Sequence, residues 1–471
     1  MRIAISAVQF SNDRPIGSKR PRALAQLLAE RGHDVTVFTP WTEPHETAPV
    51  PPGVTVRTLP PYPSAAREQQ SASLWRRALL FAFVAPTVPR ATVLSSPRLS
   101  RLFGIGADRR ESAFEELNKR RKLTVDRVRS LLDARRWASQ AGDQLTASET
   151  TGFDAILSTY APFGSLIFGR LLARRNQGST WVSDIRDAMV VPSILWTGRV
   201  VMAFQERKAI REASTITVVS EGVKHSILEQ RANRRFADAI VVLPNGFLDR
   251  DQRADRAAAE PAAAGPAPLR IGYTGQIYAE GRDATPLFRA IDAIRQGHPA
   301  TRVEVHYAGN QGHLMTAFAA TFGLEDLVVD HGMLSHAQAV ELQDSMDLLL
   351  VLSWNRRNSQ GIISGKFGEY LAAEKPILAL VTGDLAGAEL SSLVRTMNVG
   401  HAWEEASGDD AQKKLTEFLH GAVRAREAGE PLAYEPDEDE RATFDYETIT
   451  SRFERLLAPG RDGDRPDSSR R

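Results

Sequence analysis

The sequence contains no cysteine among its 471 residues. This absence excludes disulfide bonds, thiolate zinc sites and cysteine nucleophiles, and it fits a reducing compartment. The formal net charge is only +1, so nothing in the overall composition indicates a nucleic-acid-binding protein. The longest apolar run, Ala78–Val88, contains Pro86 and is too short to span a bilayer.

Several common motifs are absent as well. The N-terminus, MRIAISAVQF, lacks a charged segment followed by a long apolar run, so we expect no signal peptide and a cytoplasmic protein. No GxGxxG, P-loop, GxSxG or HExxH occurs, which argues against a standard dinucleotide site and against serine or zinc hydrolases. The histidines show no metal-ligand spacing, and we therefore expect no metal and no cofactor.

The length of the chain favours two domains. Residues 1–250 alternate apolar strand patterns with amphipathic helices, beginning with Arg2–Val8, Ser18–Arg31 and Val35–Thr39. The Ala/Pro-rich residues 251–268 predict a linker between the domains.

Beyond the linker the alternation restarts with the strand pattern Leu269–Thr274 and continues through a second domain, residues 269–440. Residues 441–459 predict a C-terminal helix that packs back on the first domain, and 460–471 a disordered tail. Strands that alternate with helices form parallel sheets covered on both faces. The sequence thus predicts an α/β protein of two doubly wound, Rossmann-like domains facing each other across a cleft. In such sheets ligands bind at the loops beyond the carboxyl ends of the strands.

One segment of the first domain, residues 62–150, does not fit the strand and helix alternation and predicts a helical insertion. Residues 67–136 hold 16 Lys/Arg against 7 Asp/Glu, and Leu74–Arg90 mixes aromatic residues with arginines as interfacial segments do. One hypothesis is that residues 67–136 contact an anionic membrane surface or a lipid-linked acceptor. The alternative is a helical cap with a solvated basic face.

In the second domain, Gln360–Leu380 carries the most informative pattern. A polar loop, Asn355–Ser364, is predicted to lead into a short helix with Lys366 in its first turn and Glu369 one turn later. A cation at a helix N-terminus opposes the helix dipole unless an anion offsets it, and free N–H groups there favour phosphate. Lys366 is thus either a phosphate ligand or a solvated surface lysine.

The loop after the strand Leu269–Thr274 offers further phosphate ligands. Gly275 leaves room for a phosphate at the end of the strand, and Arg282 could pair with it. The alternative is an ordinary turn with a solvated arginine.

Two strand-end loops of the first domain complete the candidates. Gly17, just before a helix, would permit close approach of the backbone to a ligand on the acceptor side. The strand WVSDIRD ends in three charged residues, Asp184, Arg186 and Asp187. Because unpaired buried charges are costly, these side chains either pair internally or face a ligand.

At these residues the chain resembles the GT-B glycosyltransferases, and most closely the retaining family 4 enzymes that use nucleotide-sugars. The resemblance rests on LAERGHDVTVFT, WVSDIRD, TITVVSEGV and LPNGF in the first domain. In the second it rests on GYTGQIY, HYAG, HGMLSHAQAVELQDSMDLLLVL and SGKFGEYLAAEKPILAL. It does not cover the insertion, the linker or the tail.

The resemblance implies that Glu369 holds the ribose hydroxyls of a nucleotide-sugar donor, with Ser364 and Gly365 beside it. It also implies that Lys366 and Arg282 neutralise the donor diphosphate near Gly275 and Gln276. Two departures stand out: Gly361 occupies the position where many relatives have a first glutamate, and Gln276 replaces the usual arginine.

The predicted function is therefore sugar transfer from a nucleoside-diphosphate sugar to an acceptor hydroxyl with retention of configuration, without a metal, in cell-surface glycan or glycolipid synthesis. The acceptor would be a glycan or a lipid-linked molecule, and the enzyme would be cytoplasmic or peripheral on the inner face of the membrane. The alternatives are a nucleotide-sugar epimerase, an inverting transferase of the same fold, and a non-catalytic nucleotide-sugar-binding subunit.

Overall fold

The computed structural model of the protein describes residues 1–11, 16–42, 48–63, 87, 95–96, 107–248, 267–277, 281–357, 359–360 and 363–458. The chain divides into two compact units. Unit 1 comprises Met1–Val218, Val223–Val242 and the chain from Phe453 onward, and unit 2 comprises Val219–Gly222 and Leu243–Arg452.

Unit 1 is built on a seven-stranded parallel sheet in the order β3-β2-β1-β4-β5-β6-β7. Its strands are β1 (Arg2–Ser6), β2 (Asp34–Pro40), β3 (Val54–Leu59), β4 (Ala155–Tyr160), β5 (Thr180–Ile185), β6 (Thr215–Val218) and β7 (Ile240–Val242). The central strands β4 and β5 are buried along almost their whole length. This burial explains their continuous apolar sequences, because a parallel sheet is covered on both faces.

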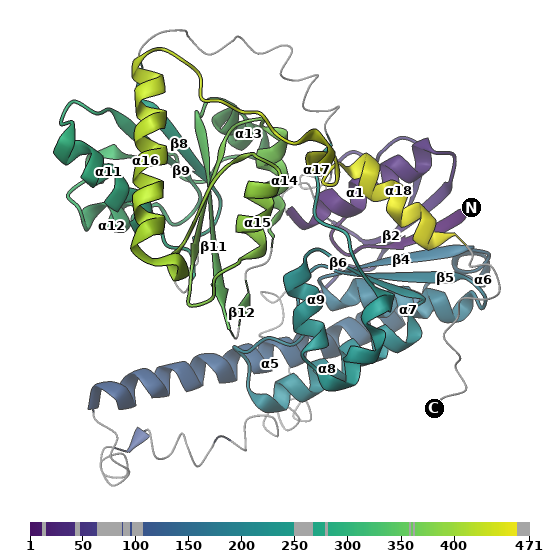
Figure 1. Ribbon diagram of the computed structural model, residues 1–471. Helices are drawn as coiled ribbons and strands as arrows, with labels where there is room; N and C mark the ends of the chain where they lie inside the picture. Colours follow the sequence, from purple (N-terminus) through teal and green to yellow (C-terminus); the bar gives the residue numbers. More distant parts are fainter. Residues whose placement is uncertain are drawn as a thin grey trace. The chain divides into compact units, whose positions relative to one another are not determined.

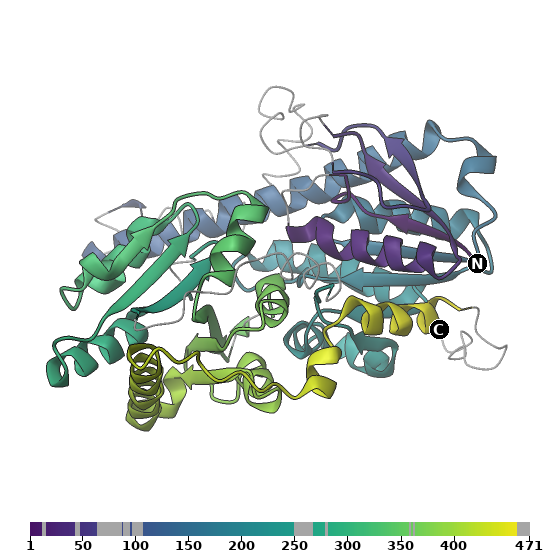
Figure 2. The same ribbon diagram turned by 90° about the horizontal axis from the view of Figure 1, so that it is seen from above.

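Helices cover both faces of this sheet. In Figure 1, α1 (Ile16–Glu30) and the end of α18 (Tyr446–Leu457) lie on one face, and α5 (Ala107–Asp143), α7 (Phe163–Arg175) and α8 (Trp196–Glu212) lie on the other. Figure 2 shows α1, in purple, against the strands from a second direction. The unit also contains the short helix α6 (Ala147–Thr150), the helix α9 (Glu221–Leu228) from Val223 onward, and the 3-10 helix η4 (Arg231–Ala239).

The described part of the segment predicted as an insertion belongs to the core of unit 1. The 37-residue helix α5 buries Val128, Leu131 and Trp137. The Trp137 ring lies 5.9 Å from that of Phe168 on α7 and 5.1 Å from that of Tyr62. Helix α5 is therefore packed on unit 1, as expected for the second alternative, a helical cap. Most of residues 64–106, including Leu74–Arg90 except Thr87, lies outside the described residues.

Unit 2 repeats the same sheet topology. Its parallel strands follow the order β10-β9-β8-β11-β13-β14, and β12 pairs with β11 in antiparallel fashion. The strands are β8 (Leu269–Thr274), β9 (Val303–Ala308), β10 (Val328–Asp330), β11 (Leu348–Arg356), β12 (Ser359–Gln360), β13 (Ile377–Thr382) and β14 (Gly400–Glu404). Strand order in both units is thus the doubly wound order 3-2-1-4-5-6, which confirms the predicted fold class.

The sheet of unit 2 separates two apolar cores, each covered by helices. One core includes Phe288 and Leu415 and the other Phe367 and Val394. The helices are α11 (Thr285–Gly297), α12 (Gly312–Ala320), α13 (His336–Asp344), α14 (Gly365–Ala372), α15 (Glu389–Thr396), α16 (Gly408–Glu427) and α17 (Glu438–Ala442), with the 3-10 helices η5 (Glu325–Leu327) and η6 (Glu405–Ser407).

Two stretches of unit 2 differ from the sequence prediction. The polar loop predicted at Asn355–Ser364 begins as a hairpin instead. Strand β11 continues to Arg356, and β12 folds back on it, with Asn355 opposite Gln360. The polar residues Ser359 and Gln360 form a strand because they pair with residues only a few positions earlier in the chain. The second stretch is α15, β14 and α16, which the sequence reading did not predict.

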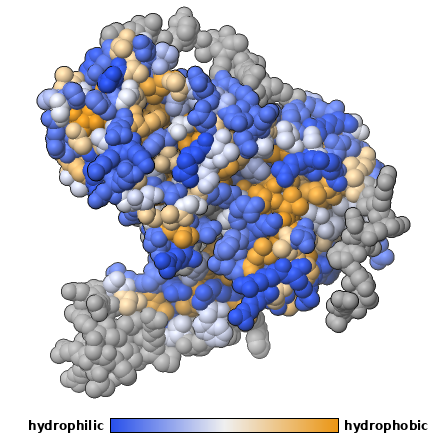
Figure 3. Space-filling view, viewed as in Figure 1, coloured by the Kyte–Doolittle hydropathy of each residue, from blue (hydrophilic) through white to orange (hydrophobic). Residues whose placement is uncertain are grey.

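The surface visible in Figure 3 is mainly hydrophilic, with apolar side chains gathered in separate patches. Within the described residues, no helix combines the length and the apolar character needed to cross a membrane.

Candidate functional site

Helix α14 begins at the carboxyl-end edge of the second sheet, and residues from distant parts of unit 2 fix its position. A Cβ on Gly368 would lie 3.0 Å from the backbone oxygen of Gly246, so the helix approaches the 245–247 segment closely. The Phe367 ring contacts Phe444 edge-on at 5.5 Å between centroids. Phe247 N–H donates to the Phe444 carbonyl at 3.0 Å. The first turn of α14 is thereby held in place from one side.

Lys366 lies in that first turn, as the sequence predicts, but it is buried. Only 8% of the residue is exposed. Its Nζ lies 4.7 Å from the centroid of the Tyr273 ring and 3.5 Å from the Tyr273 hydroxyl. A Cβ on Gly275 would lie 1.9 Å from this Nζ. Gly275 is therefore required for Lys366 to reach the end of β8, and its φ of +124° also favours glycine.

The burial of Lys366 has an electrostatic consequence. Removal from water, together with the nearby charge of Arg282, lowers the pKa of Lys366 to about 7, while Glu369 opposes this shift. The protein by itself thus does not supply enough negative charge to keep this ammonium fully protonated at neutral pH. A bound anion would do so.

Arg282 contacts the same loop. Its Nη1 donates to the carbonyl of Gln276 at 2.7 Å, and the hydroxyl of Tyr273 donates to that carbonyl at 2.6 Å. Burial raises the pKa of Tyr273, and the charge of Arg282 opposes the change. The structure therefore brings four of the predicted residues together around the end of β8: Lys366, Arg282, Gly275 and Gln276.

Sequence reasoning missed the residues that hold this loop. The Tyr307 hydroxyl donates to the Gly275 carbonyl at 3.0 Å and accepts from the Gln311 N–H at 3.0 Å. The Gln311 side chain accepts from the Ile277 N–H at 2.8 Å. A Cβ on Gly309 would lie 2.2 Å from the Tyr307 hydroxyl. In the sequence, Tyr307 resembles an ordinary core aromatic of a strand, and the glycine in HYAG is the signal that could have indicated this close approach.

The remaining donor-side candidates lie on or beside α14. Ser364 is the N-cap residue and Gly365 the first helical residue, and both are partly buried. Glu369 is partly buried one turn after Lys366. Its charge acts on Lys366 and also on Tyr370, whose pKa burial raises to about 12. Gly361 lies outside the described residues.

In unit 1, Asp184 was a candidate cleft residue, but the structure shows that its carboxylate pairs inside the protein. Its side chain is fully buried, and both carboxylate oxygens accept from Arg20 at 2.9 Å. Thr217 donates to the same carboxylate at 2.8 Å. Because these partners occupy the carboxylate, Asp184 is paired inside the protein and does not face a ligand.

Arg186 and Gly17 form a hydrogen bond with each other, so both contact the protein itself at this point. Arg186 is 9% exposed and donates to the carbonyls of Gly17 at 2.6 Å and of Ala161 at 2.7 Å. A Cβ on Gly17 would overlap the side chain of Gln9 at 1.8 Å, so the close approach at Gly17 involves the protein itself. Asp187 alone of the four predicted acceptor-side residues has an exposed side chain.

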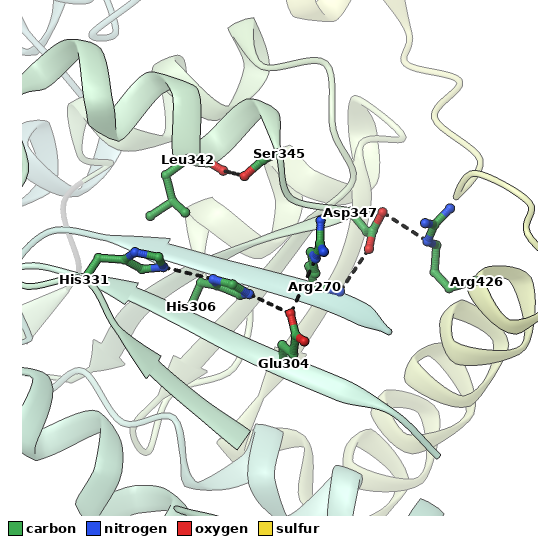
Figure 4. A network of polar contacts seen from close by, with 8 residues as sticks. All are labelled: Arg270, Glu304, His306, His331, Leu342, Ser345, Asp347 and Arg426. Carbon is green, nitrogen blue, oxygen red and sulfur yellow. Dashed lines mark hydrogen bonds and ion pairs between the residues drawn. The ribbon is translucent and has the colours of Figure 1, made fainter. Parts of the chain in front are cut away.

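A second polar cluster in unit 2 satisfies its own charges. Figure 4 shows its charged and histidine residues Arg270, Glu304, His306, His331, Asp347 and Arg426. His306 Nδ1 lies 2.9 Å from His331 Nε2, and His306 Nε2 lies 3.1 Å from Glu304. Burial lowers the pKa of His306, and the bond to Glu304 opposes this. Among the described side chains, no group of three or more metal-ligating residues could hold an ion. We assign the cluster to the stability of the sheet.

The chain matches a known protein family in sequence and is similar to solved proteins in structure. Residues 17–246 match the family described as glycosyl transferase 4-like domain. The chain is similar in structure to one described as trehalose-6-phosphate from E. coli bound with UDP-2-fluoro glucose, at a TM-score of 0.56 and 12% identity over 97% of this chain and 99% of that chain.

Two further solved structures are similar over most of their length. The alpha,alpha-trehalose 6-phosphate synthase from Burkholderia multivorans has a TM-score of 0.54 and 13% identity, over 97% of this chain and 98% of that chain. The lipopolysaccharide outer core galactosyltransferase WaaB has a TM-score of 0.51 and 12% identity, over 97% and 99%. No curated protein matches the chain in sequence. At these identities the likeness shows a shared two-unit fold.

Proposed function

The chain is a glycosyltransferase of the GT-B type, and we propose that it moves a sugar from a nucleoside-diphosphate sugar to an acceptor hydroxyl with retention of configuration. The observation that carries the donor assignment is the buried Lys366 in the first turn of α14, beside Arg282 and the end of β8. The structural neighbour bound with UDP-2-fluoro glucose supports a nucleotide-sugar as the donor.

The diphosphate is the group that this site fits best. Cleavage of the bond between sugar and phosphate leaves negative charge on the departing diphosphate. In the proposal Lys366 and Arg282, already positioned before the reaction, stabilise that charge as it develops. Since burial and the nearby charge of Arg282 lower the pKa of Lys366, a bound anion beside this lysine would offset that effect.

Glu369 would accept hydrogen bonds from the ribose hydroxyls of the donor, and the N-terminal turn of α14, from Gly365, would face the phosphates. Unit 1 would bind the acceptor, with Asp187 as the exposed charged side chain there. We nominate no protein nucleophile. An acceptor in a cell-surface glycan or glycolipid is part of the proposal.

A thermal-shift screen of UDP-, GDP- and ADP-sugars tests donor binding, because a ligand that binds only the native state raises its stability. With the donor thus identified, Lys366→Ala and Glu369→Ala should each lower donor turnover by more than about tenfold, since each removes a charge-assisted contact of about 1.5–3 kcal/mol. The matched control is Lys375→Ala, a partly exposed lysine just beyond α14, which should leave turnover unchanged. Near-normal kinetics in both site variants would disprove the assignment.

The same assay separates the alternatives. An epimerase would convert the donor without any acceptor, which nuclear magnetic resonance of the donor detects. An inverting enzyme would give the opposite anomer, and a non-catalytic subunit would show neither transfer nor donor hydrolysis.

For residues 67–136 the proposal remains contact with an anionic membrane or a lipid-linked acceptor. Deleting the whole segment is a poor test, because it would remove Val128 and Leu131 from the core of unit 1. The better variant is Arg76→Gln with Arg77→Gln, which should weaken flotation with anionic liposomes. Unchanged flotation would contradict this role for the two arginines.

A further inference from the structure

Helix α8 exposes an apolar stripe. Trp196, Val200 and Phe204 are 58%, 60% and 63% exposed. They are spaced four residues apart, so they lie one turn above another on one side of the helix. The opposite side faces the protein through residues such as Met202 and Ala209, which are fully buried. The helix therefore presents large apolar side chains on both sides.

This exposure is concentrated on one helix. Of the eight large hydrophobic side chains that are exposed in the described residues, three belong to α8. Single exposed apolar residues are common on protein surfaces, whereas adjacent ones usually mark an interaction site. The stripe thus needs a partner.

Basic residues continue the same side of the helix. Arg207 and Arg211 follow Phe204 by three and seven residues, and Arg199 follows Trp196 by three. Arg199 and Arg211 are exposed and Arg207 is partly exposed. Within the described part of the chain, none of these three arginines has a carboxylate within salt-bridge distance. The stripe is thus apolar from Trp196 to Phe204, with arginines beside it and beyond it.

The N-terminal end of the stripe is rigidly held. The backbone N–H of Leu195 donates to Thr124 Oγ1 on α5 at 2.8 Å. Arg120 of α5 donates to the carbonyl of Pro192 at 3.0 Å. A Cβ on Gly198 would lie 2.7 Å from the Thr124 side chain, so α8 lies closely against α5 (Figure 1). Because Trp196 follows directly, little ordering cost remains for binding.

We propose that this face of α8 docks on an anionic lipid bilayer. Trp and Phe favour the boundary between headgroups and acyl chains, and arginines beside them attract anionic headgroups. Protein interfaces also favour Trp, Phe and Arg, so self-association through the stripe is the outcome that the test below must distinguish from membrane docking. The helix lies in the membrane surface and does not cross it. The inference is independent of the proposed donor site.

Flotation with phosphatidylcholine vesicles, with and without added phosphatidylglycerol, tests the proposal on the full-length protein. The protein should float with the anionic vesicles and much less with the neutral ones. The triple variant Trp196→Gln, Val200→Gln, Phe204→Gln should lose at least about tenfold in partitioning, because each side chain loses apolar burial. Arg207→Gln and Arg211→Gln should each lose about fivefold, and added salt should weaken binding of the wild type.

The matched control is Trp41→Gln with Val50→Gln, which removes two apolar side chains of unit 1 that are 45% and 50% exposed. It should float like the wild type. Equal flotation of the wild type and the triple variant, or no preference for anionic vesicles, would overturn the proposal. So would a wild type that self-associates through the stripe in sedimentation velocity and ignores vesicles. Thermal shift by the donor should be the same in every variant, so failure of the donor site and failure of membrane docking give different results.

Discussion

Donor binding should take up a proton at Lys366, and the size of the effect follows from its burial. The pKa of Lys366 is lowered from 10.5 to about 7 in the ligand-free protein. At about pH 8, one unit higher, only about a tenth of this lysine is protonated. A diphosphate would restore the charge, so binding should consume about 0.9 proton per site at that pH. Between about pH 6 and pH 8 the affinity should fall about tenfold.

Isothermal titration calorimetry in two buffers with different ionisation enthalpies measures this uptake. A nucleotide-sugar is the right ligand, because its diphosphate, unlike that of a free nucleotide, has no group that titrates near neutral pH. In Lys366→Met the apolar chain keeps its length, the uptake should vanish and the remaining affinity should not depend on pH. Lys375→Met, the matched control, should behave like the wild type. Binding by the wild type at about pH 8 without proton uptake would refute the reasoning.

The variant Lys366→Met, which should weaken donor binding, should raise the stability of the protein when no donor is bound. The folded pKa of Lys366 lies below its unfolded value, so the unfolded state binds more protons between about 7 and 10.5. The cost of burying this lysine is therefore fully present below about pH 7 and is removed as the pH rises towards 10.5. Without donor, Lys366→Met should unfold at a higher temperature than the wild type at about pH 6, and the difference should shrink at alkaline pH. A lower unfolding temperature at acid pH would contradict the assigned burial cost.

Three further predictions concern single positions. Gly275→Ala places a Cβ 1.9 Å from Lys366 Nζ, so it should displace the lysine and weaken donor binding in calorimetry about as much as Lys366→Ala; unchanged binding would contradict the contact. Asp184→Ala leaves Arg20 buried without its partner and should destabilise unit 1 by about 3–5 kcal/mol in urea unfolding, whereas Arg20→Met with Asp184→Leu should cost much less. Burial raises the pKa of Glu206 to about 7, so stability is lost as the pH rises from about 4.5 to 7; Glu206→Gln should flatten this dependence, and an unchanged profile would count against it.

The sheets were largely predictable, because parallel strands buried on both faces leave continuous apolar runs in the sequence. The predicted bounds of β8, Leu269–Thr274, agree with the structure. The predicted enzyme class is confirmed as well. Strand β12 was missed, since Ser359–Gln360 has no apolar pattern and forms only by pairing with Asn355–Arg356.

The site was predictable only as a set of residue types at strand ends. Lys366 and Arg282 could be nominated from charge beside glycines. The burial of Lys366, however, depends on Tyr273 of strand β8, nearly a hundred residues earlier in the sequence. The internal pairing of Asp184 was equally invisible, because its partner Arg20 comes from a helix 164 residues away. Both are long-range contacts, which a local pattern cannot specify.

The support of α14 constrains any recombination of this enzyme with a relative. Gly246 and Phe247 lie before the linker predicted at 251–268, and Phe444 lies close to the C-terminus, yet they fix the helix that carries Lys366. Arg441 adds an ion pair of 3.2 Å to Glu374, just beyond that helix. A chimera with crossover points at 267 and 436 would exchange the lysine without its supports. Crossovers before Leu243 and after Arg452, at the limits of unit 2, would keep them together.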